Sequence, residues 1–76
     1  MNNIIVYSTK ACPYCVMAKE YFKSKKIDFE DVDVSADMTR AMEMIKKSGQ
    51  QGVPVLDVND QIIIGFNKPA IEAALK

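Results

Sequence analysis

The sequence contains no histidine and no tryptophan, and only two of its 76 residues are cysteines. A structural zinc site needs four ligands, so a chain with two cysteines and no histidine argues against a metal centre, and we expect none. The cysteines, Cys12 and Cys15, are only three positions apart. A disulfide between them would close a very short loop, which constrains the unfolded chain little. The cysteines are therefore free for a purpose other than stabilising the fold.

The sequence also lacks an excess of either charge, because ten basic residues balance ten acidic ones. A nucleic-acid-binding surface needs a clustered basic excess, so we expect no nucleic-acid partner. No segment approaches the roughly 18 consecutive apolar residues of a membrane span, and the start of the sequence does not resemble a secretory leader. We therefore expect a cytoplasmic protein. In the cytoplasm thiols are kept mostly reduced, and a disulfide is more often catalytic than structural.

The sequence shows no repeat, linker or low-complexity stretch, so we expect residues 1–76 to form one domain. Apolar and β-branched runs predict strands at 4–7, 27–34, 53–58 and 61–64. Helical spacing predicts helices at 13–25, from Ser35 to Gly49, and from Pro69 to Leu75. A helical crossover makes the first two strands parallel, and the pair Asn59-Asp60 turns the last two into a hairpin. The order βαβαββα predicts an α/β fold with a four-stranded mixed sheet flanked by three helices.

The helical segments also predict which side chains are buried. In the first helix the side predicted to be buried consists of Cys15, Ala18 and Phe22, and Val16 and Met17 widen this stripe. Lys19, Glu20 and Lys23 are predicted to face away from it. In the second helix, Met38 and Met42 recur at helical spacing with Ile45, which predicts that the methionines fill the core. Ser35 is expected to be the N-cap of that helix, and Gly49 its left-handed end.

The position of the two cysteines predicts redox chemistry. Cys12 stands at the start of the first helix, where unpaired N–H groups and the helix dipole favour a thiolate, and Lys10 adds a nearby positive charge. The thiolate is the reactive form of cysteine. Cys15 is one turn further on, on the buried stripe. We therefore predict that Cys12 attacks a substrate disulfide and that Cys15 then resolves the mixed disulfide.

The motif Cys12-Pro13-Tyr14-Cys15 resembles that of a glutaredoxin, of the short bacterial dithiol type. The resemblance spans the chain, with Tyr7-Ser8-Thr9 before the motif, residues 49–54 before the hairpin, and Gly65-Phe66 before the last helix. It implies a thioredoxin-like fold. It also implies a thiol–disulfide oxidoreductase that reduces protein disulfides or protein–glutathione mixed disulfides, with glutathione as co-substrate. We expect a monomer.

The resemblance implies a site for substrate or glutathione around the dithiol. Val53 would present its backbone to the substrate beside a cis Pro54. The other residues assigned to this site are Lys10, Tyr14, Gln51, Gly65, Phe66 and Asn67. Three positions depart from the usual pattern. Thr9 stands where a lysine is common, and Lys10 is displaced from that position by one residue. Gly52 stands where threonine is common, and Phe66 replaces a glycine, with no aspartate after it.

Two alternatives remain open. The Gly-Phe pair is more typical of redoxins that are reduced by a thioredoxin-reductase-type enzyme and serve a protein client such as ribonucleotide reductase. The other is an iron–sulfur carrier, in which two chains and two glutathiones hold a cluster. The carrier is disfavoured because Cys15 would compete for Cys12 as a disulfide and because Pro13 stiffens the motif.

Overall fold

In the computed structural model, which describes residues 3–75, the elements follow in the expected order βαβαββα. They are β1 (Ile4–Ser8), α1 (Pro13–Ser24), β2 (Glu30–Asp33), α2 (Met38–Ser48), β3 (Val55–Val58), β4 (Gln61–Ile64) and α3 (Lys68–Ala74). This is the thioredoxin-like α/β fold, so the predicted fold class is confirmed. No helix within residues 3–75 is long and apolar enough to cross a membrane.

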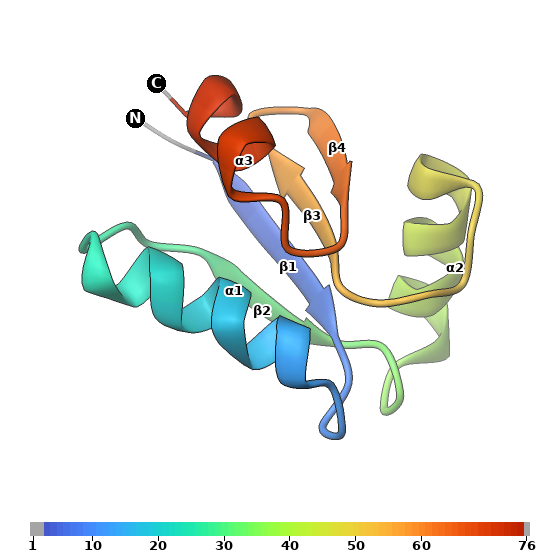
Figure 1. The fold of residues 1–76 in the computed structure, drawn as a ribbon. Coiled ribbons are helices and arrows are strands. Elements are labelled where there is room, and N and C mark those ends of the chain that lie inside the picture. The colour runs from blue at the N-terminus through green and yellow to red at the C-terminus, as the bar shows by residue number, and fades with distance from the viewer. Residues whose placement is uncertain (1–2, 76) are drawn as a thin grey trace.

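The four strands of the described chain form one mixed sheet in the order β2-β1-β3-β4 (Figure 1). β1 is parallel to β2, and β3 is antiparallel to both β1 and β4. Asn59 and Asp60 have φ angles of 53° and 70°, which confirms the predicted hairpin turn between β3 and β4. Because of these directions, the carboxyl ends of β1 and β4 and the start of β3 lie at the same edge of the sheet.

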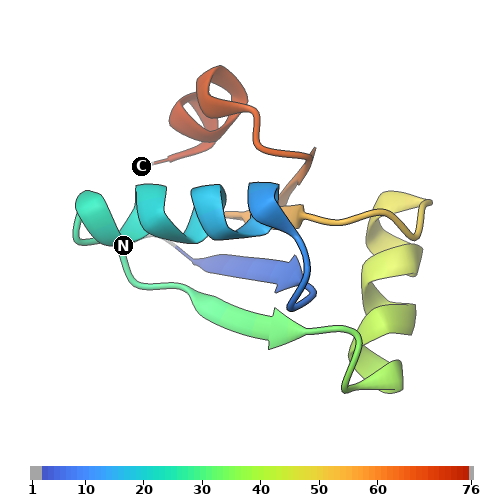
Figure 2. The ribbon, with the colours of Figure 1, turned by 60° about the horizontal axis from the view of Figure 1, so that its bottom comes forward.

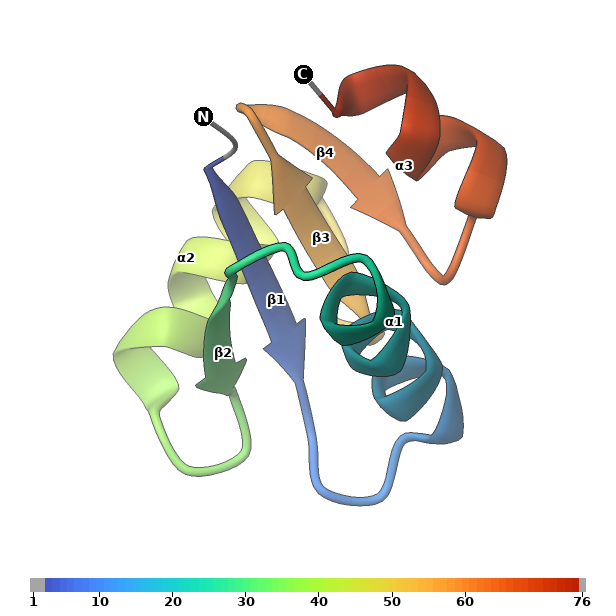
Figure 3. The ribbon, with the colours of Figure 1, turned by 90° about the vertical axis from the view of Figure 1, so that its left-hand side faces the viewer.

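The helices cover both faces of the sheet, with α1 and α3 on one face and α2 on the other (Figures 2 and 3). Each face has its own apolar cluster. The cluster under α1 and α3 contains Ile4, Val6, Ala18, Tyr21, Phe22, Leu56, Val58, Ile63, Ile71 and Ala74. The cluster under α2 contains Tyr7, Val32, Met44 and Val55. The predicted burial of Cys15, Ala18 and Phe22 is confirmed, since none of the three has exposed surface.

Four other burial predictions for the helices are wrong. Val16 and Met17 of α1 are 51% and 47% exposed, and Met38 and Met42 of α2 are 79% and 63% exposed. Met44 fills the core under α2 in their place. Each of the two helices carries more apolar residues than fit on the one side that faces the sheet. The helical period alone therefore did not identify which of the overlapping stripes meets the sheet.

The start of α2 also differs from the prediction. Its N-cap is Asp37, whose side chain accepts the N–H of Arg40 at 3.1 Å, and not Ser35. The N–H and hydroxyl of Ser35 both donate to the carboxylate of Asp33, which shapes the turn that leaves β2. The predicted end of the helix is confirmed, because Gly49 has a φ of 75°.

A partly buried polar network ties α2 to the sheet. Lys47 donates to the carboxylate of Asp57 at 2.8 Å and to the hydroxyl of Tyr7 at 2.9 Å, and that hydroxyl donates to Glu43. Asp57, on β3, is only 6% exposed. Burial acts to lower the pKa of Lys47, but the hydrogen bonds to Asp57 and Tyr7 outweigh it and raise that pKa overall. Lys47 therefore carries its charge at neutral pH and neutralises the buried Asp57.

We predict that Lys47→Met lowers the free energy of unfolding by about 2 kcal/mol at neutral pH, because it leaves the carboxylate of Asp57 buried without its cation. Lys46→Met is the matched control. Lys46 is exposed, and the substitution makes the same change of side chain one position earlier in the sequence. It should change the stability by less than about 0.5 kcal/mol. Urea unfolding followed by circular dichroism measures both. Equal effects of the two substitutions would contradict a specific role of Lys47.

Candidate active site

Cys12 is the N-cap of α1, at the end of the loop that leaves β1. Its backbone is extended, with φ −116° and ψ 103°, and Pro13 is the first helical residue. The sulfur of Cys12 accepts a hydrogen bond from the N–H of Cys15 at 3.2 Å. It thus takes the role that a hydroxyl or carboxylate oxygen usually has at a helix start. An N–H donor and the positive end of the helix dipole both stabilise negative charge on this sulfur.

Cys15 lies in the first turn of α1 and has no exposed surface, whereas Cys12 is 9% exposed. Both thiols are free. Burial, followed by the hydrogen bond between the two cysteine side chains, raises the pKa of the Cys15 thiol to about 12. The N–H of Thr9 and the positive charge of Lys19 act in the opposite direction. Cys15 is therefore protonated at neutral pH in the reduced protein, and the prediction that it is the more buried thiol is confirmed.

Cys12 contributes to the pKa of Cys15 in two ways. Two of the contributions that raise the pKa of Cys15 come from Cys12, namely the hydrogen bond and the repulsion by its negative charge. A Cys12 sulfur bound in a mixed disulfide carries no charge. Its capture by a substrate therefore removes the repulsion and lowers the pKa of Cys15. The pKa of the Cys15 thiol thus depends on the state of the Cys12 sulfur.

The segment before β3 lies beside the dithiol loop. The Val53–Pro54 peptide bond is cis, which confirms the prediction for Pro54. Val55 pairs with Tyr7 near the end of β1, from which the chain runs to Cys12. The N–H of Gly65, the residue after β4, donates to the carbonyl of Pro54 at 2.9 Å. The sheet thus brings the 53–54 segment and Gly65 to the same edge as the dithiol (Figure 1).

Three other residues assigned to the site lie on the surface near this edge. Tyr14 is 62% exposed within the motif. Lys10 and Gln51 are exposed in the loops that precede Cys12 and Pro54. The pKa of Asp33 on β2 is held low chiefly by hydrogen bonds from Ser35, and Lys10 adds a smaller electrostatic contribution. The charge of Lys10 therefore acts partly on β2.

Phe66 and Asn67 make structural contacts. The ring of Phe66 packs edge-on against Tyr21, with 5.9 Å between ring centres, and contributes to the core under α1 and α3. The side chain of Asn67 caps α3 by accepting the N–H of Ala70 at 3.3 Å. Phe66 is thus held to α1, and the Asn67 side chain is engaged with its own helix.

Sequence reasoning missed the role of Lys19, which it placed on the outer side of α1. The amine of Lys19 forms an ion pair with Asp31 of β2 at 3.2 Å. The hydroxyl of Ser8, at the end of β1, donates to the same carboxylate at 3.2 Å. The available signal was the spacing, because Lys19 follows Cys15 by four residues and therefore lies next to it on the helix surface.

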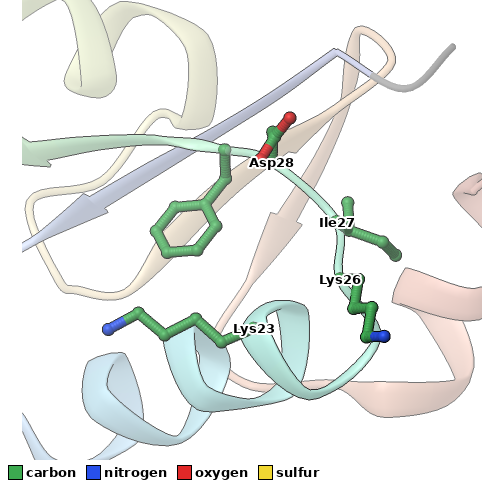
Figure 4. Close-up of a pocket in the computed structure, with 5 residues that line it drawn as sticks. Lys23, Lys26, Ile27 and Asp28 are labelled. Atoms are coloured by element: carbon green, nitrogen blue, oxygen red, sulfur yellow. The ribbon is translucent and has the colours of Figure 1, made fainter.

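A surface hollow of about 350 Å³ lies at the other end of α1 (Figure 4). It is lined by Lys23, Lys26, Ile27, Asp28 and Phe29. None of these side chains is a thiol, and the hollow is separated from Cys12 by the length of the helix. Among residues 3–75, no group of three or more acidic or cysteine side chains is placed to hold a metal ion. The dithiol edge is therefore the candidate active site.

Fold and site together define a dithiol redox protein, with a reactive cysteine at a helix start and a buried partner one turn away. Residues 4–63 match the family model described as glutaredoxin. The chain belongs to the glutaredoxin family of thiol–disulfide oxidoreductases.

Three similar proteins illustrate the range of the family. A glutaredoxin-like 8.6 kDa protein of the rubredoxin operon of Clostridium pasteurianum is 49% identical over 96% of this chain and 97% of its own length. Glutaredoxin 3 of Escherichia coli K12 is 35% identical over 86% of this chain and 78% of its own. The solved structure of NrdH-redoxin from Escherichia coli, described as a glutaredoxin-like protein with a thioredoxin-like activity profile, is 25% identical. The two structures superpose with a TM-score of 0.80 over 93% of this chain and 92% of the redoxin.

We predict that iodoacetamide modifies only Cys12 when the reduced protein is alkylated near pH 7, because alkylation requires a thiolate and the pKa of Cys15 is about 12. Mass spectrometry should find one added group, on the peptide with Cys12, and two after alkylation in denaturant. Modification of Cys15 in the native protein at a rate like that of Cys12 would contradict the proposed difference between the two thiols.

Proposed function

We propose that this protein reduces protein disulfides and protein–glutathione mixed disulfides through Cys12 and Cys15. The Cys12 thiolate attacks one sulfur of the substrate disulfide, and the other sulfur leaves as a thiolate that takes up a proton. Cys15 then attacks the sulfur of Cys12, releases the second substrate thiol, and closes the Cys12–Cys15 disulfide. Two electrons pass from the dithiol to the substrate. The reaction needs a compartment that keeps thiols reduced, which supports a cytoplasmic location.

The observation that carries this proposal is the different environment of the two sulfurs. The sulfur of Cys12 accepts the N–H of Cys15 at the helix start, whereas Cys15 has no exposed surface and a pKa of about 12. A pair of inert core cysteines would need neither the capping position nor this asymmetry. A nucleophile and a resolving thiol need both.

We propose that glutathione reduces the Cys12–Cys15 disulfide and occupies the edge formed by the 53–54 segment and Gly65. Membership of the glutaredoxin family and the similarity to glutaredoxin 3 support this proposal. Val53, before the cis bond, would offer its backbone to the glutathione cysteine, in the manner of an added strand residue. Lys10, Tyr14 and Gln51 surround this edge and would contribute to substrate binding.

A second candidate source of electrons is a thioredoxin-reductase-type enzyme. The 65–68 segment favours it, because Phe66 packs against Tyr21 and the side chain of Asn67 is already bound to the N–H of Ala70. The ring of Phe66 and the amide oxygen of Asn67 are therefore already engaged within the protein. The similarity to a redoxin with a thioredoxin-like activity profile points the same way.

We predict that Cys12→Ser abolishes reduction of both kinds of substrate, because no other thiol is placed to attack first. Cys15→Ser should abolish reduction of protein disulfides but retain reduction of a glutathionylated protein. In that variant free glutathione can resolve the mixed disulfide on Cys12. Reduction of insulin by the pre-reduced protein without glutathione, and reduction of glutathionylated albumin with excess glutathione, measure the two activities. Equal loss of both activities in the two variants would refute the separate roles.

The electron source is tested with the oxidised protein and NADPH. We expect glutathione with glutathione reductase to regenerate the dithiol faster than thioredoxin reductase without glutathione does. NADPH oxidation, coupled to a disulfide substrate, measures both rates. Turnover supported only by thioredoxin reductase would replace the glutathione proposal by the second candidate, and it would leave the roles of Cys12 and Cys15 intact.

A further inference from the structure

A hydrogen-bonded chain of three side chains connects β1, β2 and α1 beside the dithiol. Lys19 of α1 lies 3.2 and 3.3 Å from the two carboxylate oxygens of Asp31 on β2, and the hydroxyl of Ser8 on β1 donates to Asp31 at 3.2 Å. Ser8 is buried, and 22% of the Lys19 side chain is exposed. The Asp31 side chain is 51% exposed, and ion pairs this open to solvent add little to stability. The hydrogen bonds among these three side chains do, however, hold the amine of Lys19 beside Asp31.

Lys19 and Cys15 share one side of α1. The two residues are four apart on α1 and therefore lie on the same side of the helix. Burial and Cys12 have the largest effects on the Cys15 thiol, and the N–H of Thr9 and the charge of Lys19 act against them, Lys19 with the smallest effect of these. Lys19 is the positively charged side chain among these groups.

The other elements near this end of the sheet direct their charged groups elsewhere. Lys47 and Asp57 bind each other on the opposite face of the sheet, under α2. Lys68 of α3 lies over the ring of Tyr21, 5.7 Å from its centre, further along α1. Lys10 acts on Asp33. Among these lysines, Lys19 is the one that acts on the Cys15 thiol.

We propose that Lys19, anchored by Asp31 and Ser8, is a positioning residue that stabilises the thiolate of Cys15 during resolution of the mixed disulfide. The inference rests on the proposed two-step function. In that step the Cys15 sulfur forms a bond to the sulfur of Cys12 as the bond from Cys12 to the substrate breaks. The proton lost by Cys15 is balanced by the proton that the released substrate thiolate takes up.

The charge of Lys19 matters mainly in this second step. Cys12 has its own N–H donor and the helix start, whereas Cys15 is buried and needs a compensating charge to ionise. A nearby charge of this kind shifts a thiol pKa by about one unit. A pKa lower by one unit raises the fraction of Cys15 in the thiolate form about tenfold. Because a less basic thiolate is also a weaker nucleophile, the rate of resolution rises only about threefold.

The test separates the two steps with dithiodipyridine, an uncharged disulfide whose product absorbs light. One equivalent reacts with the reduced protein in stopped flow. Attack by Cys12 releases the first thiopyridone, and resolution by Cys15 releases the second. For Lys19→Gln we expect an unchanged first phase and a second phase about threefold slower at neutral pH. The midpoint of the pH profile of the second phase should shift upward by about one unit.

Two matched variants act as controls. Lys19→Arg keeps the charge and the bond to Asp31, and it should restore the second phase. Lys23→Gln removes an exposed lysine one turn further along α1 and should leave both phases unchanged. A second phase of Lys19→Gln that equals the wild-type phase at every pH would overturn the inference. So would a second phase of Lys19→Arg as slow as that of Lys19→Gln, because loss of rate despite the retained charge is the signature of a structural defect.

The result also distinguishes the inference from the function on which it rests. A wild-type protein that releases only one thiopyridone would refute the two-step function itself. A wild-type protein with both phases and a Lys19→Gln variant with a slower first phase would show that Lys19 serves Cys12 or the substrate, and this result would overturn the inference alone.

Discussion

The hydrogen bond from the N–H of Cys15 to the sulfur of Cys12 is the interaction on which the rest of the site depends. It places one sulfur at the positive end of α1, and the helix geometry then places the second sulfur one turn inside the protein. The asymmetry between the two thiols is therefore a property of a helix start packed on a sheet. It needs no metal, no histidine and no additional acid or base.

The sheet supplies what the helix cannot. β1 carries the chain to the dithiol, and its antiparallel pairing with β3 brings Pro54 to the same edge. The bond from Gly65 to the carbonyl of Pro54 adds the end of β4 to this edge. Three segments far apart in the sequence thus converge because the carboxyl ends of β1 and β4 and the start of β3 coincide. Loops fixed by a sheet in this way form a more rigid surface than loops alone.

The opposite face of the sheet has a different role. There the core is smaller, and Lys47, Tyr7 and Asp57 link α2 to the strands through a polar network. Every buried side-chain nitrogen and oxygen within the described residues has a hydrogen-bond partner. A fully satisfied network specifies one arrangement of α2, whereas an apolar contact alone would permit several. The apolar side chains of α2 that remain outside, Met38 and Met42, follow from this single orientation.

The sequence by itself determined the order of the elements, the hairpin at Asn59 and Asp60, the left-handed end at Gly49, and the dithiol with its more buried Cys15. The cis isomer of Pro54 was predicted only through the resemblance to a family. Turn residues and helix starts act within a few positions of the chain, so local sequence is enough to identify them.

Tertiary structure decided which stripe of each helix is buried, which residue caps α2, and which residue pairs with Lys19. Val16 and Met42 face solvent, Asp37 replaces Ser35, and Lys19 of α1 forms an ion pair with Asp31 of β2. In each case the deciding partner comes from another element. An amphipathic pattern shows that a helix has a buried side, but only the surface against which it packs selects the residues that form it.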